Sequence, residues 1–248
     1  MAHLTARLLG PLTVTLKDDP VAGFESDKAR ALFAYLVVET GRPHRREKLA
    51  GLLWPERPDR AARANLRHTL ANLREILGDR GRTTGPDLPP PFLDVSRQTI
   101  QLNTESDTWV DATAFTDLVE GGGLLSDDVR ELERAVHLYR GHFLEGFSVG
   151  DSPPFEEWAL LKREQLRRMA IETLQRLADA YEHRGEYKRA LPYAWRQVEL
   201  DPWRERAHRQ LMRLLALSGQ RGAALAQYET CRRVLAEELG VEPAQETT

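Results

Sequence analysis

A repeat with a period of 34 residues in the second half of this 248-residue chain most constrains its fold. Residues 171–202, IETLQRLADAYEHRGEYKRALPYAWRQVELDP, carry two successive helical patterns with a glycine at the turn between them. A shift of 34 positions places residues of the same type on one another: Leu177 on Leu211, Gly185 on Gly219, Ala190 on Ala224 and Leu191 on Leu225. Helix pairs of this kind bury their apolar faces only by stacking on neighbouring pairs. The sequence therefore predicts an all-α, tetratricopeptide-like helical repeat domain.

The first hundred residues carry strand and helix patterns in a different order. Alternating apolar residues predict the strands, and apolar spacings of three and four residues predict the helices. The predicted elements are a strand pair over 3–9 and 12–16, a first helix capped by Ser26, helices over Arg45–Leu53 and Arg60–Leu77, and a hairpin over 92–103 with Arg97 at its tip. Strands, three helices and a terminal hairpin are the order of a winged helix-turn-helix domain. We therefore expect a mainly α chain, with an N-terminal winged helix-turn-helix (α+β) domain followed by the repeats.

The predicted third helix has two different faces. At about 100° per residue, one stripe is apolar and suits a core: Ala62, Leu66, Leu70, Leu73 and Leu77. The opposite face mixes polar groups with alanines: Arg60, Ala64, Arg67, His68, Ala71, Asn72 and Glu75. Small residues let a helix approach a groove closely, while guanidinium and amide groups bond to base edges and phosphates. The helix by itself is equally compatible with a solvated surface helix.

Charge is distributed unevenly along the chain, although the net charge is −3. Residues 1–103 carry 16 lysines and arginines against 12 acidic residues, whereas residues 104–248 carry 19 against 26. From Arg57 to Arg82, seven arginines stand against three acidic residues. Phosphate binding depends on the groups in contact and on the counterions released, not on the charge of the whole chain. The first half therefore suits nucleic acid despite the acidic total.

Three side chains on the outward face are the candidates for base contacts. Arg67, His68 and Asn72 are predicted to reach base edges, since arginine pairs with guanine and asparagine with adenine. A helix rotation of one residue exchanges base-reading and phosphate-binding roles.

Four arginines are the candidates for backbone contacts. Arg60, Arg63 and Arg74 lie nearer the flanks of the helix and are predicted to bind phosphates. Arg97 at the hairpin tip is predicted to reach the DNA backbone or the minor groove. The alternative for Arg63 is an ion pair with Asp59 on the same helix.

Other functional classes have little support in the sequence. The single Cys231 excludes an intramolecular disulfide and is predicted to be a packing residue, and no Cys/His cluster has zinc-ligand spacing. The phosphate-loop pattern G-x-x-x-x-G-K-[ST] and the H-E-x-x-H pattern do not occur. We therefore predict no enzyme, with no catalytic residue, no cofactor and no metal. No signal peptide or membrane span is recognisable, which predicts a soluble, cytoplasmic protein without a membrane partner.

Longer blocks of the sequence resemble a known family of bacterial regulators. The blocks are KARALFAYLVVETGRP, LAGLLWPERPDRAARANLRHTLANLREIL, WVDATAF, EEWALLKREQLRRMAIETLQRLADAYEHRGEY and the ending ETCRRVLAEELGVEPAQET. They are similar to the Streptomyces antibiotic regulatory protein-like (SARP/AfsR-type) transcriptional regulators. The resemblance covers essentially the whole chain, and LLWP followed by ARANLR at this spacing is its most specific motif. It implies an OmpR/PhoB-type winged-helix DNA-binding domain over residues 1–104 and a bacterial transcriptional activator domain over residues 108–248.

The resemblance also implies partners. It implies an activator that binds double-stranded DNA with its third helix in the major groove, as a homodimer on promoter direct repeats, and that contacts RNA polymerase. The loop WPERPD is a candidate for the polymerase contact, while Trp54 itself is predicted to anchor the core. Where the family often has Ser or Thr as the cap of the second helix, Arg45 stands here.

Two alternatives for the function stay open. In one, the repeats form a tetratricopeptide-type protein-interaction module, or serve only as a spacer or dimer surface. In the other, the chain is the N-terminal part of a larger multidomain signalling ATPase regulator.

Overall fold

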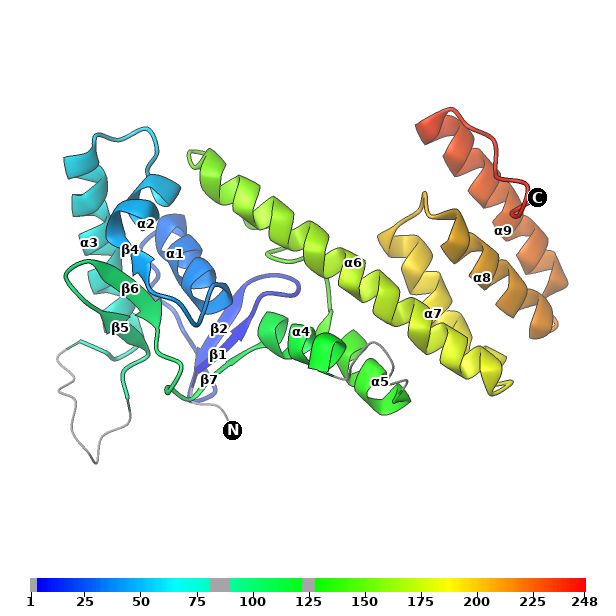
Figure 1. Ribbon diagram of the computed structural model, residues 1–248, viewed down its shortest axis with the longest axis horizontal. Coiled ribbons are helices and arrows are strands. Elements are labelled where there is room, and N and C mark those ends of the chain that lie inside the picture. Colours follow the sequence, from blue (N-terminus) through cyan, green and yellow to red (C-terminus); the bar gives the residue numbers. More distant parts are fainter. Residues whose placement is uncertain (1–3, 81–89, 122–127) are drawn as a thin grey trace. The chain divides into compact units, whose positions relative to one another are not determined.

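The computed structural model describes residues 4–80, 90–121 and 128–248, and it is mainly helical with two small sheets (Figure 1). This confirms the predicted mainly α class. The chain divides into two compact units that are interleaved in sequence. Unit 1 holds Met1–Ala114 and Leu138–Gln165, and unit 2 holds Phe115–His137 and Leu166–Thr248. The predicted domains, 1–104 and 108–248, are instead two continuous stretches of the chain, and they stay a prediction.

The first sheet of unit 1 has four strands in the order β3-β2-β1-β7. Their bounds are Leu4–Arg7 for β1, Thr13–Leu16 for β2, Asp19–Pro20 for β3 and Thr108–Val110 for β7. The predicted strand pair is confirmed as the antiparallel pair β1–β2, in which Leu4 faces Leu16; His3 lies outside the described residues. The parallel partner β7 was not predicted, because its three residues are too short to show alternation.

Three helices and a second sheet complete the part of unit 1 that precedes β7 (Figure 1). The helices are α1 Asp27–Val38, α2 Arg46–Leu53 and α3 Asp59–Ile76, and the strands are β4 His44–Arg45, β5 Leu93–Val95 and β6 Thr99–Leu102. Ser26 caps α1 as predicted, with its hydroxyl accepting from the amide of Ala29 at 3.3 Å. The predicted hairpin is confirmed as β5–β6, and β4 pairs with β6 on its other side. At the start of α2, Arg45 occupies the cap position without a side-chain hydrogen bond.

Asp111, the first residue of α4 (Asp111–Gly121), links three parts of the sequence within unit 1. Its buried carboxylate accepts hydrogen bonds from the amides of Leu8 at 2.7 Å and Leu9 at 3.1 Å, and from Arg140 Nη2 at 3.2 Å. Burial raises the pKa of the Asp111 carboxyl, and these donors offset only part of that effect. The buried polar group is thus fully bonded, as a stable core requires.

The segment Leu138–Gln165 packs on α1 within the same unit. The ring of Trp158 lies 5.0 Å from that of Tyr35, centroid to centroid, and its indole Nε1 donates to Glu39 Oε1 at 3.1 Å. Lys162 Nζ lies 3.1 Å from the same carboxylate oxygen. Residues far from the first hundred in sequence therefore complete the packing of the predicted first helix.

Unit 2 is built from helices that pack in sequence order. Unit 2 contains the later residues of α4, α5 (Val129–Leu138) except its last residue, and the part of α6 (Pro153–His183) from Leu166 onward. Its other elements are α7 Tyr187–Leu200, α8 Glu205–Leu217, α9 Arg221–Val234 and a π-helical turn Leu235–Leu239. Neighbours α7 and α8, and α8 and α9, lie side by side (Figure 1). The common core of α6, α7 and α8 includes Leu177, Tyr181, Ala190 and Leu211, all fully buried. Within the described residues, no helix combines the length and apolar character needed to cross a membrane.

The helix boundaries of unit 2 repeat with the period found in the sequence. α6 ends at His183 and α8 at Leu217, and both following turns use a glycine with positive φ, Gly185 at 72° and Gly219 at 85°. Burial differs between the two repeats, because Leu191 packs against the core whereas Leu225 is 65% exposed. The helix pair α8–α9 follows α7, whereas no helix pair follows α9 within the described residues.

Glu39→Gln is expected to remove a pH-dependent part of the stability. Burial alone raises the pKa of the Glu39 carboxyl, but hydrogen bonds from Trp158 and Lys162 and the charges of Lys162 and Arg42 lower it below the ordinary 4.5. A lowered carboxyl pKa stabilises the folded state above pH 4.5, and this gain is lost as the pH falls through the folded-state pKa. In urea unfolding at about pH 7, the wild type should be more stable than the variant by about 1 kcal/mol, and the difference should shrink toward about pH 3.

The exposed Glu56 provides the matched control, since Glu56→Gln removes the same charge from a loop. A Glu39→Gln difference that stays constant over the whole pH range would contradict the assignment.

Candidate nucleic-acid interface

Burial of its apolar stripe fixes the rotation of α3. The five predicted stripe residues are each at most 5% exposed: Ala62, Leu66, Leu70, Leu73 and Leu77. α3 packs against α1 and α2, which are the predicted first and second helices. Four predicted contact residues of α3 are left at or near the surface, with exposed side chains at Arg60, Arg63, Arg67 and His68.

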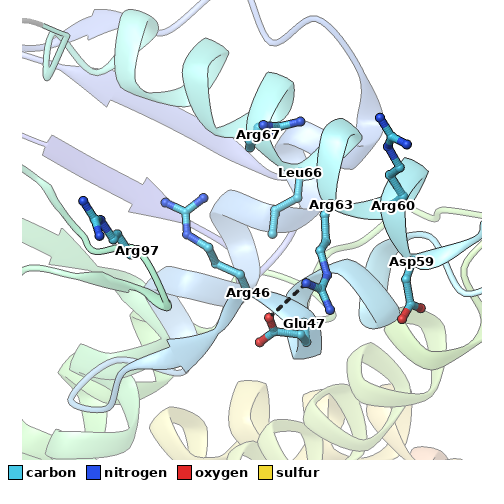
Figure 2. Close-up of a pocket in the computed structure, with 8 residues that line it drawn as sticks. All are labelled: Arg46, Glu47, Asp59, Arg60, Arg63, Leu66, Arg67 and Arg97. Carbon is cyan, nitrogen blue, oxygen red and sulfur yellow. Dashed lines mark ion pairs between the residues drawn. The ribbon is translucent and has the colours of Figure 1, made fainter.

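A basic hollow of about 540 Å³ is lined by α3, the start of α2 and the tip of the hairpin β5–β6 (Figure 2). Its lining residues are Arg46, Glu47, Asp59, Arg60, Arg63, Leu66, Arg67 and Arg97. The structure thus brings together four of the seven predicted contact residues: Arg60, Arg63, Arg67 and Arg97. Five arginines against two carboxylates leave a formal excess of three positive charges. Arginine forks in such a setting suit the phosphates of a nucleic-acid backbone.

Arg46 is a member of the basic hollow that the sequence analysis missed. It is the first residue of α2, and its guanidinium lies between Arg97 on the hairpin and Arg67 on α3 (Figure 2). Partial burial and then the neighbouring charge of Arg67 lower the pKa of the Arg46 guanidinium. The sequence signal was the pair Arg45-Arg46 at the start of the second helix, but only the tertiary structure shows that the hairpin tip lies against it.

Two carboxylates compete for the basic face. Arg63 Nη1 lies 3.7 Å from Glu47 Oε1 on α2 (Figure 2). Its ion-pair partner is therefore Glu47 and not Asp59, the alternative that the sequence suggested. His68 Nε2 lies 3.1 Å from Glu25 Oε2, in the segment before α1. Both pairs are exposed to solvent and are therefore weak enough for a phosphate to replace them.

The prediction that Asn72 contacts a base is wrong, because its side chain is only 7% exposed. Its Nδ2 donates to the carbonyl of Gly23 at 3.0 Å, and its Oδ1 accepts from the amide of Glu25 at 3.3 Å. Both ends of the amide are therefore used to hold the segment before α1 against α3. The helical wheel placed Asn72 outward because it cannot show a chain segment that crosses the helix.

Arg74 also lies outside the basic hollow, near the C-terminal end of α3. Its Nη2 donates to the carbonyl of Asp79 at 3.2 Å, within the turn that follows the helix. The carboxylate of Asp79 in turn accepts from the amides of Phe92 at 3.0 Å and Leu93 at 2.9 Å, at the start of β5. Arg74 thus has a structural contact away from the basic hollow, and its predicted phosphate contact stays a prediction.

Trp54 is buried, which confirms its predicted role as a core anchor between α2 and α3. Lys28 Nζ lies 5.9 Å from the centre of its ring and forms an ion pair with Asp151 at 2.8 Å. The hydroxyl of Ser152 donates to the carbonyl of Leu52 at 2.5 Å, just before Trp54 in the chain. The turn that leads into α3 is thus held by side chains from the segment Leu138–Gln165.

One hydrolase-like motif was overlooked in the sequence. Residues 146–150 read GFSVG, which has the G-x-S-x-G spacing of a nucleophile elbow. That motif requires a sharp turn from a strand into a helix, with the serine at its apex. Here residues 147–149 form an irregular segment after a turn, and α6 begins only at Pro153. The spacing therefore occurs without the geometry that makes the serine a nucleophile.

Comparison with known proteins gives a consistent group of regulators. The sequence model of the family described as "Bacterial transcriptional activator domain" matches residues 110–248, more than half of the chain. Transcriptional regulatory protein MoaR1 of Mycobacterium tuberculosis is 29% identical over 242 residues, which cover 96% of this chain and 74% of that protein. Regulatory protein AfsR of Streptomyces coelicolor is 28% identical over 242 residues, which cover 95% of this chain but 22% of that protein.

A solved structure of a related protein has a similar fold. It is described as Mycobacterium tuberculosis EmbR in complex with low affinity phosphopeptide, and it is 26% identical with a TM-score of 0.73. The match covers 100% of this chain and 63% of that chain. This chain thus spans less than two thirds of the EmbR chain and about a fifth of AfsR.

Asn72→Ala is expected to destabilise the fold by about 1–3 kcal/mol, because it leaves the Gly23 carbonyl and the Glu25 amide without their partner. Urea unfolding measures this loss directly. His68→Ala, at an exposed position of the same helix, is the matched control and should change the stability by less than about 0.5 kcal/mol. Equal stability of Asn72→Ala and wild type would refute the structural role of this amide.

Proposed function

We propose that this chain, which belongs to the bacterial transcriptional activator domain family of transcriptional regulators, binds promoter DNA through the basic hollow. The observation that carries this proposal is the convergence of five arginines from α2, α3 and the hairpin tip around one opening. The ligand is double-stranded DNA, with α3 in the major groove and the hairpin tip on the backbone or in the minor groove. Regulation of this kind requires no catalytic site, and we propose none.

Roles within the interface follow from position on α3. Arg67 and His68 lie past the first two turns of the helix and are proposed to meet base edges. Arg60 and Arg63 lie in the first two turns, where the helix N-terminus also favours a phosphate, and are proposed to bind the backbone. Arg97 contributes from the hairpin.

The proposal includes the finer assignment of the fold. We assign residues 1–104 to an OmpR/PhoB-type winged helix-turn-helix and residues 108–248 to tetratricopeptide-like repeats. The order β1–β2, α1–α3 and β5–β6 supports the first assignment. The 34-residue spacing between the ends of α6 and α8, with a positive-φ glycine after each, supports the second.

Partners beyond DNA are part of the same proposal. The loop between α2 and α3 is exposed at Glu56, Arg57 and Pro58, which suits a contact with RNA polymerase beside the promoter. We further propose binding as a homodimer on direct repeats, the half-site spacing of which would match one or more helical turns of DNA. Action on promoter DNA places the protein in the bacterial cytoplasm.

A second role, as a protein-interaction module, is favoured by one observation in unit 2. Large apolar side chains stay exposed there, with Trp203 at 48% and Leu225 at 65%. Exposed apolar side chains on a helical repeat suit a protein partner. A partner captured in stoichiometric amount, without enrichment of the protein on chromatin, would favour this role over DNA binding.

Arg67→Ala and Arg60→Ala are expected to weaken DNA binding in different ways. Removal of a base-reading side chain costs about 1–3 kcal/mol and relaxes selectivity at one base position, whereas removal of a phosphate-binding side chain weakens binding to all sequences alike. Fluorescence anisotropy with a promoter duplex and its single-base variants separates the two effects. Arg184→Ala removes an exposed arginine from unit 2 and serves as the charge-matched control, for which no change is expected.

Genome-wide mapping of bound fragments supplies the promoter duplex for these measurements. The proposal fails if the wild type prefers no genomic fragment over random duplex at physiological salt.

A further inference from the structure

Arg46 holds the hairpin tip from both sides of Arg97. Its backbone amide donates to the carbonyl of Gln98 at 2.9 Å. Its side chain donates to the carbonyl of Ser96 twice, from Nε at 3.1 Å and from Nη2 at 2.8 Å. The two carbonyls that flank Arg97 are therefore both bonded to one residue of α2.

The hairpin tip is ordered by its own hydrogen bonds as well. The hydroxyl of Ser96 accepts from the amides of Gln98 at 3.1 Å and Thr99 at 2.8 Å. The adjoining strand β6 pairs with β4, where Arg45 faces Thr99. Since the tip is internally ordered, the bonds from Arg46 hold the backbone on both sides of Arg97 against the start of α2.

The same guanidinium has donors left for a ligand. A guanidinium carries five N–H groups in a planar fork, and the Ser96 carbonyl receives bonds from only two of its nitrogens. Arg46 lines the basic hollow together with Arg67 and Arg97 (Figure 2). The nearby carboxylate Glu47 contacts Arg63 instead. The positive charge around Arg46 is therefore undercompensated, and a bound anion would stabilise it.

We infer that Arg46 has two roles in DNA binding: it binds one phosphate of the DNA backbone between α3 and the hairpin, and it positions Arg97 through the Ser96 and Gln98 carbonyls. This inference rests on the proposed DNA binding and assigns a further residue to it. The ligand is a phosphodiester, which is the same in every sequence, so Arg46 contributes affinity and not base selectivity.

Binding of Arg46 variants to the promoter duplex tests the phosphate contact. Arg46→Ala is expected to weaken binding roughly 10-fold or more, as expected when a charge-assisted hydrogen bond is removed, and to do so equally for all single-base variants of the site. The slope of log affinity against log salt should fall in magnitude by about one for each phosphate that the variant no longer binds. Lys48→Ala removes a positive charge from an exposed position of the same helix outside the basic hollow, and it should leave affinity and slope nearly unchanged.

A double-mutant cycle tests the positioning role. If Arg46 positions Arg97, the loss of affinity caused by Arg46→Ala is smaller in an Arg97→Ala background than in the wild type. Additive losses of affinity would overturn the positioning role. Thermal unfolding of each variant verifies that the fold is retained, so that a loss of affinity reports the interface.

A scan with single methylphosphonate linkages locates the phosphate, because each linkage neutralises one backbone charge. The expected result is one position in each half-site at which neutralisation weakens binding of the wild type but not of Arg46→Ala. The inference, but not the proposed function, is overturned if the wild type binds the promoter selectively and every linkage that weakens its binding also weakens binding of Arg46→Ala. A wild type without any preference for the promoter would instead overturn the proposed function.

Discussion

Burial of the apolar stripe of α3 is the constraint on which the interface depends. Leu66, Leu70 and Leu73 each remove a large side chain from water, at roughly 1.5–3 kcal/mol apiece, so rotating the helix by one position is strongly disfavoured. This burial fixes the exposed positions of Arg60, Arg63 and Arg67. It also turns Asn72 inward, where its amide holds the segment before α1. The same packing thus decides which polar residues are available to a ligand and which are structural.

The basic hollow is preorganised, but carboxylates of the same chain neutralise part of its positive charge. Arg46 fixes the hairpin tip, while Glu47 and Glu25 contact Arg63 and His68. Exposed ion pairs of this kind contribute little to stability and are screened by salt. In the free protein Glu47 offsets part of the positive charge of the hollow, and an anion that binds there would replace such a weak contact at small cost.

The unit that carries the basic hollow also contains residues that the family match assigns to the activator domain, residues 110–248. Asp111 bonds to the end of β1, and Trp158 and Lys162 bond to Glu39 at the end of α1. The turn into α3 is held in the same way, through Ser152 and Asp151. Substitutions in this part of the activator domain are therefore able to affect α1–α3 by altering their packing.

The sequence by itself determined the helices, the hairpin and the repeat register, because each depends on local spacing: the apolar stripe of α3, the cap Ser26, the polar tip at Arg97 and the glycines 34 residues apart. It also identified most of the arginines that converge in the basic hollow. Only the tertiary structure decided the contacts between distant segments. It placed Arg46 beside the hairpin tip, turned Asn72 inward, left Arg74 outside the basic hollow, and packed the segment Leu138–Gln165 on α1. The physical reason is that periodicity reports which face of an element is buried, whereas the partner that buries it is set by chain topology.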